Sequence, residues 1–133
     1  MTGRSNPKLA HDIAKILGQE VHEPISVFSD GEIRVRIPVS MRNKHVFIIQ
    51  PTAPNANDSI MELVLMIDAA KRSSASAISA IIPYFGYSRQ DRKEMPRVPI
   101  SSSLVAHMIV NAGATQILTI DIHSQQHQAF VRI

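Results

Sequence analysis

The chain has no cysteine, and aromatic residues make up only 5% of its 133 residues. The absence of cysteine excludes disulfide bonds and thiolate metal sites. The scarcity of aromatics argues against a stacking surface for single-stranded nucleic acid. No apolar run is long enough to cross a membrane, because the longest candidate, residues 60–70, is broken by Glu62 and Asp68. No apolar signal region follows Met1, so we expect a cytoplasmic protein without a membrane partner.

The residues that are present suit a single globular domain with a hydrophobic core. Hydrophobic residues make up 44% of the chain, and the formal net charge is +3. A basic balance favours anionic partners, although it does not choose among nucleotides, sugar phosphates and nucleic acid. A basic nucleic-acid-binding module therefore stays open as an interpretation that rests on charge alone.

Hydrophobic periodicity predicts alternating helices and strands. The expected helices are residues 7–17, which Gly18 ends, residues 59–72, which Asn57 or Asp58 caps, and residues 100–111. The expected strands are an extended piece at 25–28, a half-buried strand at 32–39, and buried strands at 45–50, 77–82 and 116–122. The residues expected to face the core from the first two helices are Leu9, Ile13, Ile16 and Leu17, then Ile60, Leu63, Val64 and Ile67. This order predicts an α/β fold with a parallel sheet, in which ligands bind beyond the carboxyl ends of the strands.

The loop after the second buried strand, residues 83–99, carries three cations within five residues, at Arg89, Arg92 and Lys93. Guanidinium groups can bind phosphate oxygens in bidentate fashion. Gly86 frees the backbone at a point where a ligand could approach. A solvated basic loop is an equally good interpretation from composition alone.

Asp121 and His123 end the third buried strand, and strand alternation places them on the same side. A carboxylate and an imidazole could hold a divalent ion that serves phosphates. A structural histidine beside a capping aspartate explains the same pair. His127 lies four residues after His123, but no third ligand with suitable spacing follows.

Phe28, Asp30, Gly31 and Glu32 belong to a turn that is expected to join the two extended segments as a β-hairpin. If the turn binds a nucleotide, its carboxylates would face a base edge or a ribose, because carboxylates repel phosphates. A simple hairpin turn with charged flanks explains the same residues. No glycine loop of the Walker type is present, so a bound nucleotide would be held by side chains and a metal.

Five ordered motifs together resemble the ribose-phosphate diphosphokinase family, also called phosphoribosyl pyrophosphate synthetases. The resemblance runs from about Asn6 to Phe130. The motifs are FSDGE at 28–32, IMELVLMIDAAKR at 60–72, IPYFGYSRQDRK at 82–93, AGATQ at 112–116 and DIHSQQHQAF at 121–130.

The resemblance implies a three-layer, phosphoribosyltransferase-like domain with a parallel sheet and a hairpin, or flag, around Asp30 and Gly31. Residues 1–133 would form the first of two such domains, assembled into homodimers and hexamers. The implied reaction is Mg²⁺-dependent transfer of a diphosphoryl group from ATP to ribose 5-phosphate. No catalytic residue is expected in this half.

The resemblance also assigns site residues. Arg89, Gln90 and Asp91 are implied to line the ATP site, with Arg89 near the phosphates. Phe28, Asp30, Gly31 and Glu32 are implied to reach the adenine of ATP held by a neighbouring subunit, and His123, with Asp121 behind it, to help hold magnesium.

The sequence departs from the family pattern at several positions. Ala129, His127 and Ser103 stand where the family usually has glycine, an apolar residue and lysine. The second domain's sugar-phosphate loop and the catalytic loop are absent, so we expect a fragment or truncated product that is inactive alone. A non-catalytic associated protein of the same family is the alternative.

Overall fold

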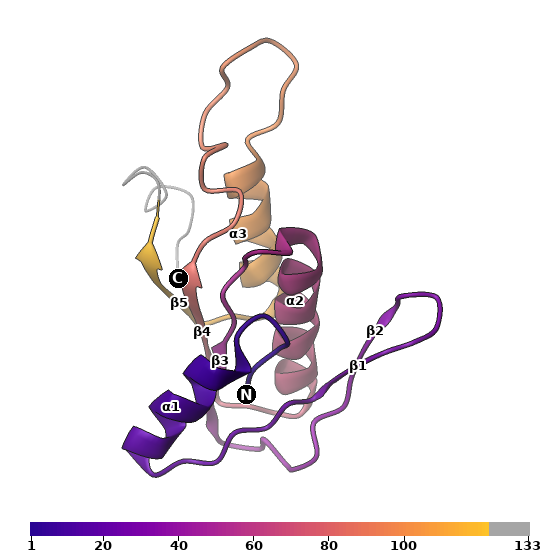
Figure 1. Ribbon diagram of the computed structural model, residues 1–133, viewed down its shortest axis with the longest axis vertical. Coiled ribbons are helices and arrows are strands. Elements are labelled where there is room, and N and C mark those ends of the chain that lie inside the picture. The colour runs from indigo at the N-terminus through magenta and orange to yellow at the C-terminus, as the bar shows by residue number, and fades with distance from the viewer. Residues whose placement is uncertain (123–133) are drawn as a thin grey trace.

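The computed structural model describes residues 1–122 of the chain, and those residues form three helices and five strands (Figure 1). In chain order the elements are α1 (Pro7–Leu17), β1 (Ile25–Val27), β2 (Ile33–Val35), β3 (His45–Ile49), α2 (Ala56–Arg72), β4 (Ala77–Tyr84), α3 (Ser101–Ala112) and β5 (Gln116–Asp121). No helix within this described part is long and apolar enough to span a bilayer.

The architecture is a parallel sheet between helical layers, as the sequence predicts. The strand order is β3-β4-β5 with both pairs parallel, and β1 pairs with β2 in an antiparallel hairpin. Helices α2 and α3 pack together on one side of the sheet, and α1 lies on the other side (Figure 1). Each connection from β3 to β4 and from β4 to β5 contains a helix, as parallel pairing requires.

The core lies between the sheet and α2. Ile60, Leu63 and Ile67 are buried as expected, and Val64 packs beside them at intermediate exposure. The α2 helix begins at Ala56, with Asn55 at its N-cap, so the expected cap at Asn57 or Asp58 is wrong. Neither residue is available for that role, because both lie within the first helical turn.

Helix α1 has the predicted bounds but a different buried face. Asn6 caps it by accepting a hydrogen bond from the Leu9 amide at 3.1 Å. Ala10 and Ala14 are the buried residues, whereas Ile16 is 84% exposed and Leu17 is 64% exposed. The expectation that these last two face the core is wrong. The α1 residues that line the groove between this helix and the sheet include Ala10 and Ala14 but not Ile16, which points to solvent.

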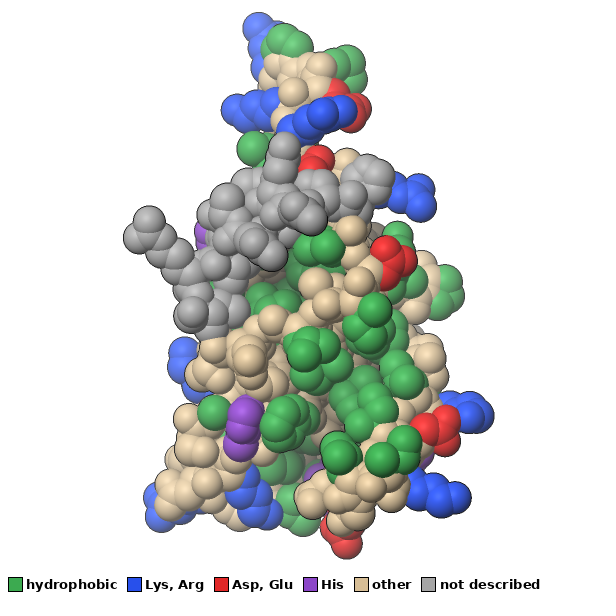
Figure 2. Space-filling view, turned by 90° about the vertical axis from the view of Figure 1, so that its left-hand side faces the viewer, with side chains coloured by type: hydrophobic (Ala, Val, Ile, Leu, Met, Phe, Trp, Pro, Cys, Tyr) green, Lys and Arg blue, Asp and Glu red, His purple; other side chains and the backbone are tan. Residues whose placement is uncertain are grey.

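Strand β5 is less buried than its apolar sequence predicts. Leu118 and Ile120 are exposed, the latter by 78%, because β5 is an edge strand of the three-stranded sheet. Together with Phe47 on β3 they belong to the side of the sheet that faces α1, where a groove of about 610 Å³ runs between α1 and the strands. Figure 2, which views the molecule from the α1 side, shows hydrophobic side chains gathered on this face.

The hairpin forms where it was predicted, although β2 is shorter than the expected strand. Ile33 and Val35 are half-buried and Arg34 is exposed, so the predicted alternation is confirmed. The register pairs Ile25 with Val35 and Val27 with Ile33. The inner face of the hairpin packs toward α2, which leaves its outer face to solvent.

A buried ionic network, which the sequence analysis did not anticipate, joins the first residues to α2. Glu62 is only 2% exposed, and its carboxylate accepts from the Arg4 guanidinium at 2.6 Å, the Arg4 amide at 2.8 Å and the Gln50 amide nitrogen at 2.8 Å. Gln50 in turn accepts from the Ser5 hydroxyl at 3.0 Å. A buried carboxylate is tolerated here because its oxygens receive hydrogen bonds from three donors.

Candidate functional site

The carboxyl ends of the strands meet at one edge of the sheet. Thr52, just after β3, bonds to the Tyr84 carbonyl through its amide at 3.0 Å and its hydroxyl at 2.9 Å. The amide of Phe85 donates to the Asp121 carbonyl at 3.4 Å. The carboxyl ends of β3, β4 and β5 are therefore tied together at the edge where parallel sheets bind ligands.

Gly86 is required by packing at this edge. Its amide donates to the Thr52 hydroxyl. A Cβ at position 86 would lie 2.9 Å from the Thr52 carbonyl oxygen and 3.3 Å from the Ala56 Cβ. The glycine thus lets β4 pass close to the start of α2, and this internal contact explains it without the ligand approach expected from the sequence.

The next residue, Tyr87, turns the chain away from the sheet. Its φ of 64° lies in the left-handed region, which is costly for a residue with a side chain. The Tyr87 hydroxyl donates to Oδ1 of Asn57 in the first turn of α2. This long-range bond holds an otherwise unfavourable backbone conformation.

Arg89 and Gln90 follow on the same turn and are both exposed. The Gln90 amide donates to the Tyr87 carbonyl at 2.9 Å. Its Oε1 accepts from the Ser101 hydroxyl at 2.6 Å, and its carbonyl accepts from the Ser102 amide at 3.2 Å. The turn is therefore anchored at its far end to the first residues of α3, and Arg89 is exposed between this anchor and the bond from Tyr87 to Asn57.

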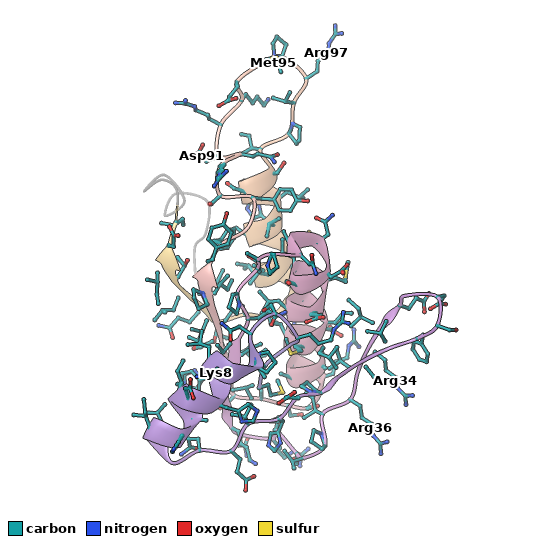
Figure 3. All side chains as sticks on the ribbon, viewed as in Figure 1. Lys8, Arg34, Arg36, Asp91, Met95 and Arg97 are labelled. Carbon is teal, nitrogen blue, oxygen red and sulfur yellow. The ribbon has the colours of Figure 1, made fainter. Side chains whose placement is uncertain are left out.

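Asp91 is buried, unlike its two neighbours. After it the chain projects away from the domain, as Figure 3 shows with Asp91 at the base of this segment and Met95 and Arg97 toward its tip. Arg92 and Lys93 are exposed within this projection. The three cations that are close in sequence thus divide into one on the anchored turn and two on the projecting segment.

The hairpin tip is built from local bonds. The Phe28 amide donates to the Glu32 carbonyl at 2.9 Å, and the Gly31 amide donates to the Phe28 carbonyl at 3.0 Å. Gly31 has a φ of 93°, and Asp30 accepts from the Glu32 amide at 3.1 Å. Phe28 is half exposed, and the Arg34 guanidinium carbon lies 5.9 Å from its ring centre.

The two groups of residues that the resemblance assigns to ATP do not meet within one chain. In Figure 1 the hairpin tip projects from one side of the domain, and the segment after β4 leaves it in a different direction. We call residues 86–90 the Arg89 turn. One copy of the chain therefore presents the hairpin tip and the Arg89 turn as separate surfaces.

Asp121 ends β5 and is exposed, with its backbone opposite Tyr84. His123 and His127 lie outside the described residues. Within residues 1–122 no group of three or more histidine, aspartate or glutamate side chains is arranged to hold a metal ion. An exposed carboxylate is a suitable oxygen donor for a hard cation such as Mg²⁺, so Asp121 fits one ligand position.

The parallel sheet, its helices on both faces and the polar turns beyond its carboxyl ends define an α/β domain with a ligand-binding edge. A family model described as the N-terminal domain of ribose phosphate pyrophosphokinase matches residues 1–113. The chain belongs to this family.

Curated relatives and a solved structure agree with this family. The ribose-phosphate pyrophosphokinase of Wolinella succinogenes is 53% identical, and the match covers 99% of this chain and 43% of that protein. That of Thermotoga maritima is 49% identical, with 99% and 42% covered. The crystal structure of phosphoribosylpyrophosphate synthetase from Mycobacterium smegmatis superposes with a TM-score of 0.93 at 42% identity, covering 97% of this chain and 44% of that one. The chain spans less than half the length of these relatives.

Proposed function

We propose that this chain is the ATP-binding half of a ribose-phosphate diphosphokinase. The observation that carries the proposal is the exposed Arg89, which lies on an anchored turn at the carboxyl edge of the sheet. The family to which the chain belongs supports the reaction. In that reaction the anomeric hydroxyl oxygen of ribose 5-phosphate bonds to the β-phosphorus of ATP. The bond from this phosphorus to the oxygen that bridges it to the α-phosphorus breaks, AMP leaves with that oxygen, and the hydroxyl proton is released to solvent.

In this proposal Arg89 binds the polyphosphate, with Gln90 and Asp91 completing the turn that lines the nucleotide site. A guanidinium makes paired hydrogen bonds to phosphate oxygens, which a lysine ammonium cannot reproduce. Because the turn is formed before the ligand arrives, little of the binding free energy is spent on ordering it. Binding and positioning, rather than covalent chemistry, would be this domain's contribution.

The adenine would be held by the hairpin of a second copy. Phe28 offers a half-exposed ring for stacking, and Asp30, Gly31 and Glu32 follow it in the same turn with carboxylate and backbone groups. The separation of the hairpin from the Arg89 turn in one chain supports this arrangement. A symmetric pair would exchange hairpins and complete two sites at once. The chain would therefore act as a homodimer or within a larger assembly.

Asp121 would contribute to a magnesium site beside the phosphates, together with His123. When bound, Mg²⁺ neutralises charge that develops on the phosphate oxygens. Asp121 suits this role because it is exposed at the end of β5, on the same edge of the sheet as the Arg89 turn.

The remaining parts of the reaction would come from a second, similar domain that binds ribose 5-phosphate. We therefore expect the 133-residue chain alone to form no AMP from ATP and ribose 5-phosphate. Mixing it with the separately produced second half of the Wolinella succinogenes relative should restore measurable activity. AMP formation by the chain alone would contradict the proposal that a second domain is needed to bind ribose 5-phosphate. Tight ATP binding without any restored activity would favour a non-catalytic associated protein.

Calorimetric titration of ATP with and without Mg²⁺ tests the binding role directly. Replacing Arg89 by lysine keeps the charge but removes the paired hydrogen bonds, so we expect the ATP affinity to fall by about tenfold. The matched control is Arg92→Lys, which changes an exposed arginine on the projecting segment and should affect binding less. Equal affinities for the wild type and Arg89→Lys would remove the proposed phosphate role.

A further inference from the structure

The Arg89 turn is held from two sides by helices that are distant in sequence. On one side the Tyr87 hydroxyl bonds to Asn57, in the first turn of α2. On the other side the Gln90 side chain accepts from Ser101, the first residue of α3. Helices α2 and α3 pack on each other, so both anchors belong to one helical layer.

The first anchor counteracts an unfavourable backbone conformation. Tyr87 has a left-handed φ, which costs on the order of 1–3 kcal/mol for a residue with a side chain. Its ring packs beside the hydrophobic core, and its hydroxyl reaches the Asn57 carboxamide. Without that bond the segment would have a more extended alternative, and Arg89 would move with it.

The second anchor uses both polar ends of Gln90. Its side-chain oxygen is engaged by the Ser101 hydroxyl at 2.6 Å, and its main-chain oxygen receives the Ser102 amide at 3.2 Å. The α3 helix has Ile100 at its N-cap position, which offers no side-chain acceptor. Gln90 therefore supplies oxygen acceptors at the start of α3 and is tied to it at the same time.

We propose that Tyr87 and Gln90 are positioning residues that hold Arg89 through Asn57 and Ser101. The role of Gln90 is then to fix the turn, and its side-chain oxygen is committed to Ser101 rather than to a nucleotide. The Arg89 guanidinium is presented in one place before any ligand binds. This inference rests on the proposed function only where it connects the position of Arg89 with phosphate binding.

The first test measures the order of the turn without ligand. Backbone ¹⁵N relaxation of residues 86–90 should give order parameters of about 0.85 in the wild type, as in rigid backbone, and below about 0.6 in Tyr87→Phe and in Ser101→Ala. Two matched controls should keep the wild-type values. Tyr84→Phe removes a hydroxyl that has no hydrogen bond among the described residues. Ser103→Ala removes a hydroxyl that pairs with His107 along α3. Unchanged order in both test variants would overturn the proposal.

The second test asks whether each anchor acts through Arg89. Mg-ATP and tripolyphosphate are titrated into Tyr87→Phe and Ser101→Ala, each with and without Arg89→Ala. We expect each single variant to bind about 3- to 10-fold more weakly, in line with the loss of one hydrogen bond. In the Arg89→Ala background the same changes should alter affinity by less than about twofold, because the group that they position is gone. Equal losses in both backgrounds would overturn the positioning role.

The two tests separate the inference from the proposed function. Lower order parameters with unchanged affinity for both probes would uphold the anchoring of the turn while removing Arg89 from the phosphate site. Gln90→Ala gives an internal check. Its affinity for both probes should equal that of Ser101→Ala, and the variant with both substitutions should bind no more weakly than either single variant. Additive losses would show that Gln90 contacts the nucleotide directly and would overturn its assignment as a positioning residue.

Discussion

The hairpin tip and the Arg89 turn are both short, exposed segments to which family resemblance assigns the nucleotide, yet they are constructed in opposite ways. The hairpin tip is held by hydrogen bonds between residues at most four apart in sequence. The Arg89 turn is held by Thr52, Asn57 and Ser101, from three distant parts of the chain. The hydrogen bonds of the first are local, whereas those of the second connect it to distant parts of the domain.

This difference matches what each segment would have to do. A group that positions phosphates gains from being fixed in advance, since less binding free energy is lost in ordering it. A group that reaches into a neighbouring subunit benefits from being able to move, because the contact forms only on assembly. Four substitutions test how far the contrast holds, from the largest expected effect to the smallest.

Gly86→Ala should have the largest effect. Its new Cβ would lie 2.9 Å from the Thr52 carbonyl oxygen, and a backbone atom cannot move aside without separating the strand ends. We expect the free energy of unfolding to fall by about 3 kcal/mol, measured by urea denaturation. A variant as stable as the wild type would show that the Arg89 turn is not fixed by packing.

Gly31→Ala should lower the free energy of unfolding by less, although it also changes a glycine in a segment proposed to bind the nucleotide. No atom lies within 4 Å of the added Cβ, so the cost arises from the φ of 93° alone. We expect a loss of about 1–2 kcal/mol in the same denaturation experiment. A loss of stability as large as that of Gly86→Ala would mean that other parts of the chain pack closely against Gly31.

Ser102→Ala should change stability in the opposite direction. The Ser102 hydroxyl is fully buried and has no hydrogen-bond partner among the described residues, while its amide takes part in the Gln90 anchor. Removing an unsatisfied hydroxyl should raise the free energy of unfolding by about 1 kcal/mol and leave the turn in place. A decrease in stability on thermal unfolding would indicate that this hydroxyl has a partner.

Asp30→Ala should have the smallest effect. It removes one exposed hydrogen bond, from the Glu32 amide to the Asp30 carboxylate at 3.1 Å. We expect a loss of about 0.5 kcal/mol in stability. Amide exchange at Glu32 should be faster, while exchange in β1 and β2 stays unchanged. Slower exchange at Glu32, or a general loss of protection, would contradict a purely local role.

The sequence predicts most of the fold because the signals for it are local. The apolar positions of α2 and the alternation in β2 follow from the periods that a helix and a half-buried strand must show. The apolar run of β3 predicts the strand but not its burial, because His45 and Phe47 are exposed. The errors arise where the surroundings of an element decide which of its side chains are buried. Sequence periodicity predicts an apolar face on α1, but only the folded structure shows that Ala10 and Ala14 are buried and that Ile16 is exposed.

The candidate site is less predictable for the same reason. Family motifs identify Arg89 and Phe28, but they cannot indicate that Tyr87 bonds to a residue 30 positions earlier, or Gln90 to one 11 positions later. These partners become neighbours only when α2 and α3 pack on each other. The left-handed conformation of Tyr87 is equally hidden, since a tyrosine gives no local signal for it.

The buried Glu62 has a consequence for how such sequences can diverge. One of its three hydrogen bonds comes from the main-chain amide at position 4, which almost any residue can supply, whereas another comes from the Gln50 side chain. Many different residues should therefore be tolerated at position 4, even though Arg4 pairs with the Glu62 carboxylate. Changes at positions 50 and 62 should be rare and should occur together. A library randomised at these three codons and selected for folded protein would reveal this asymmetry.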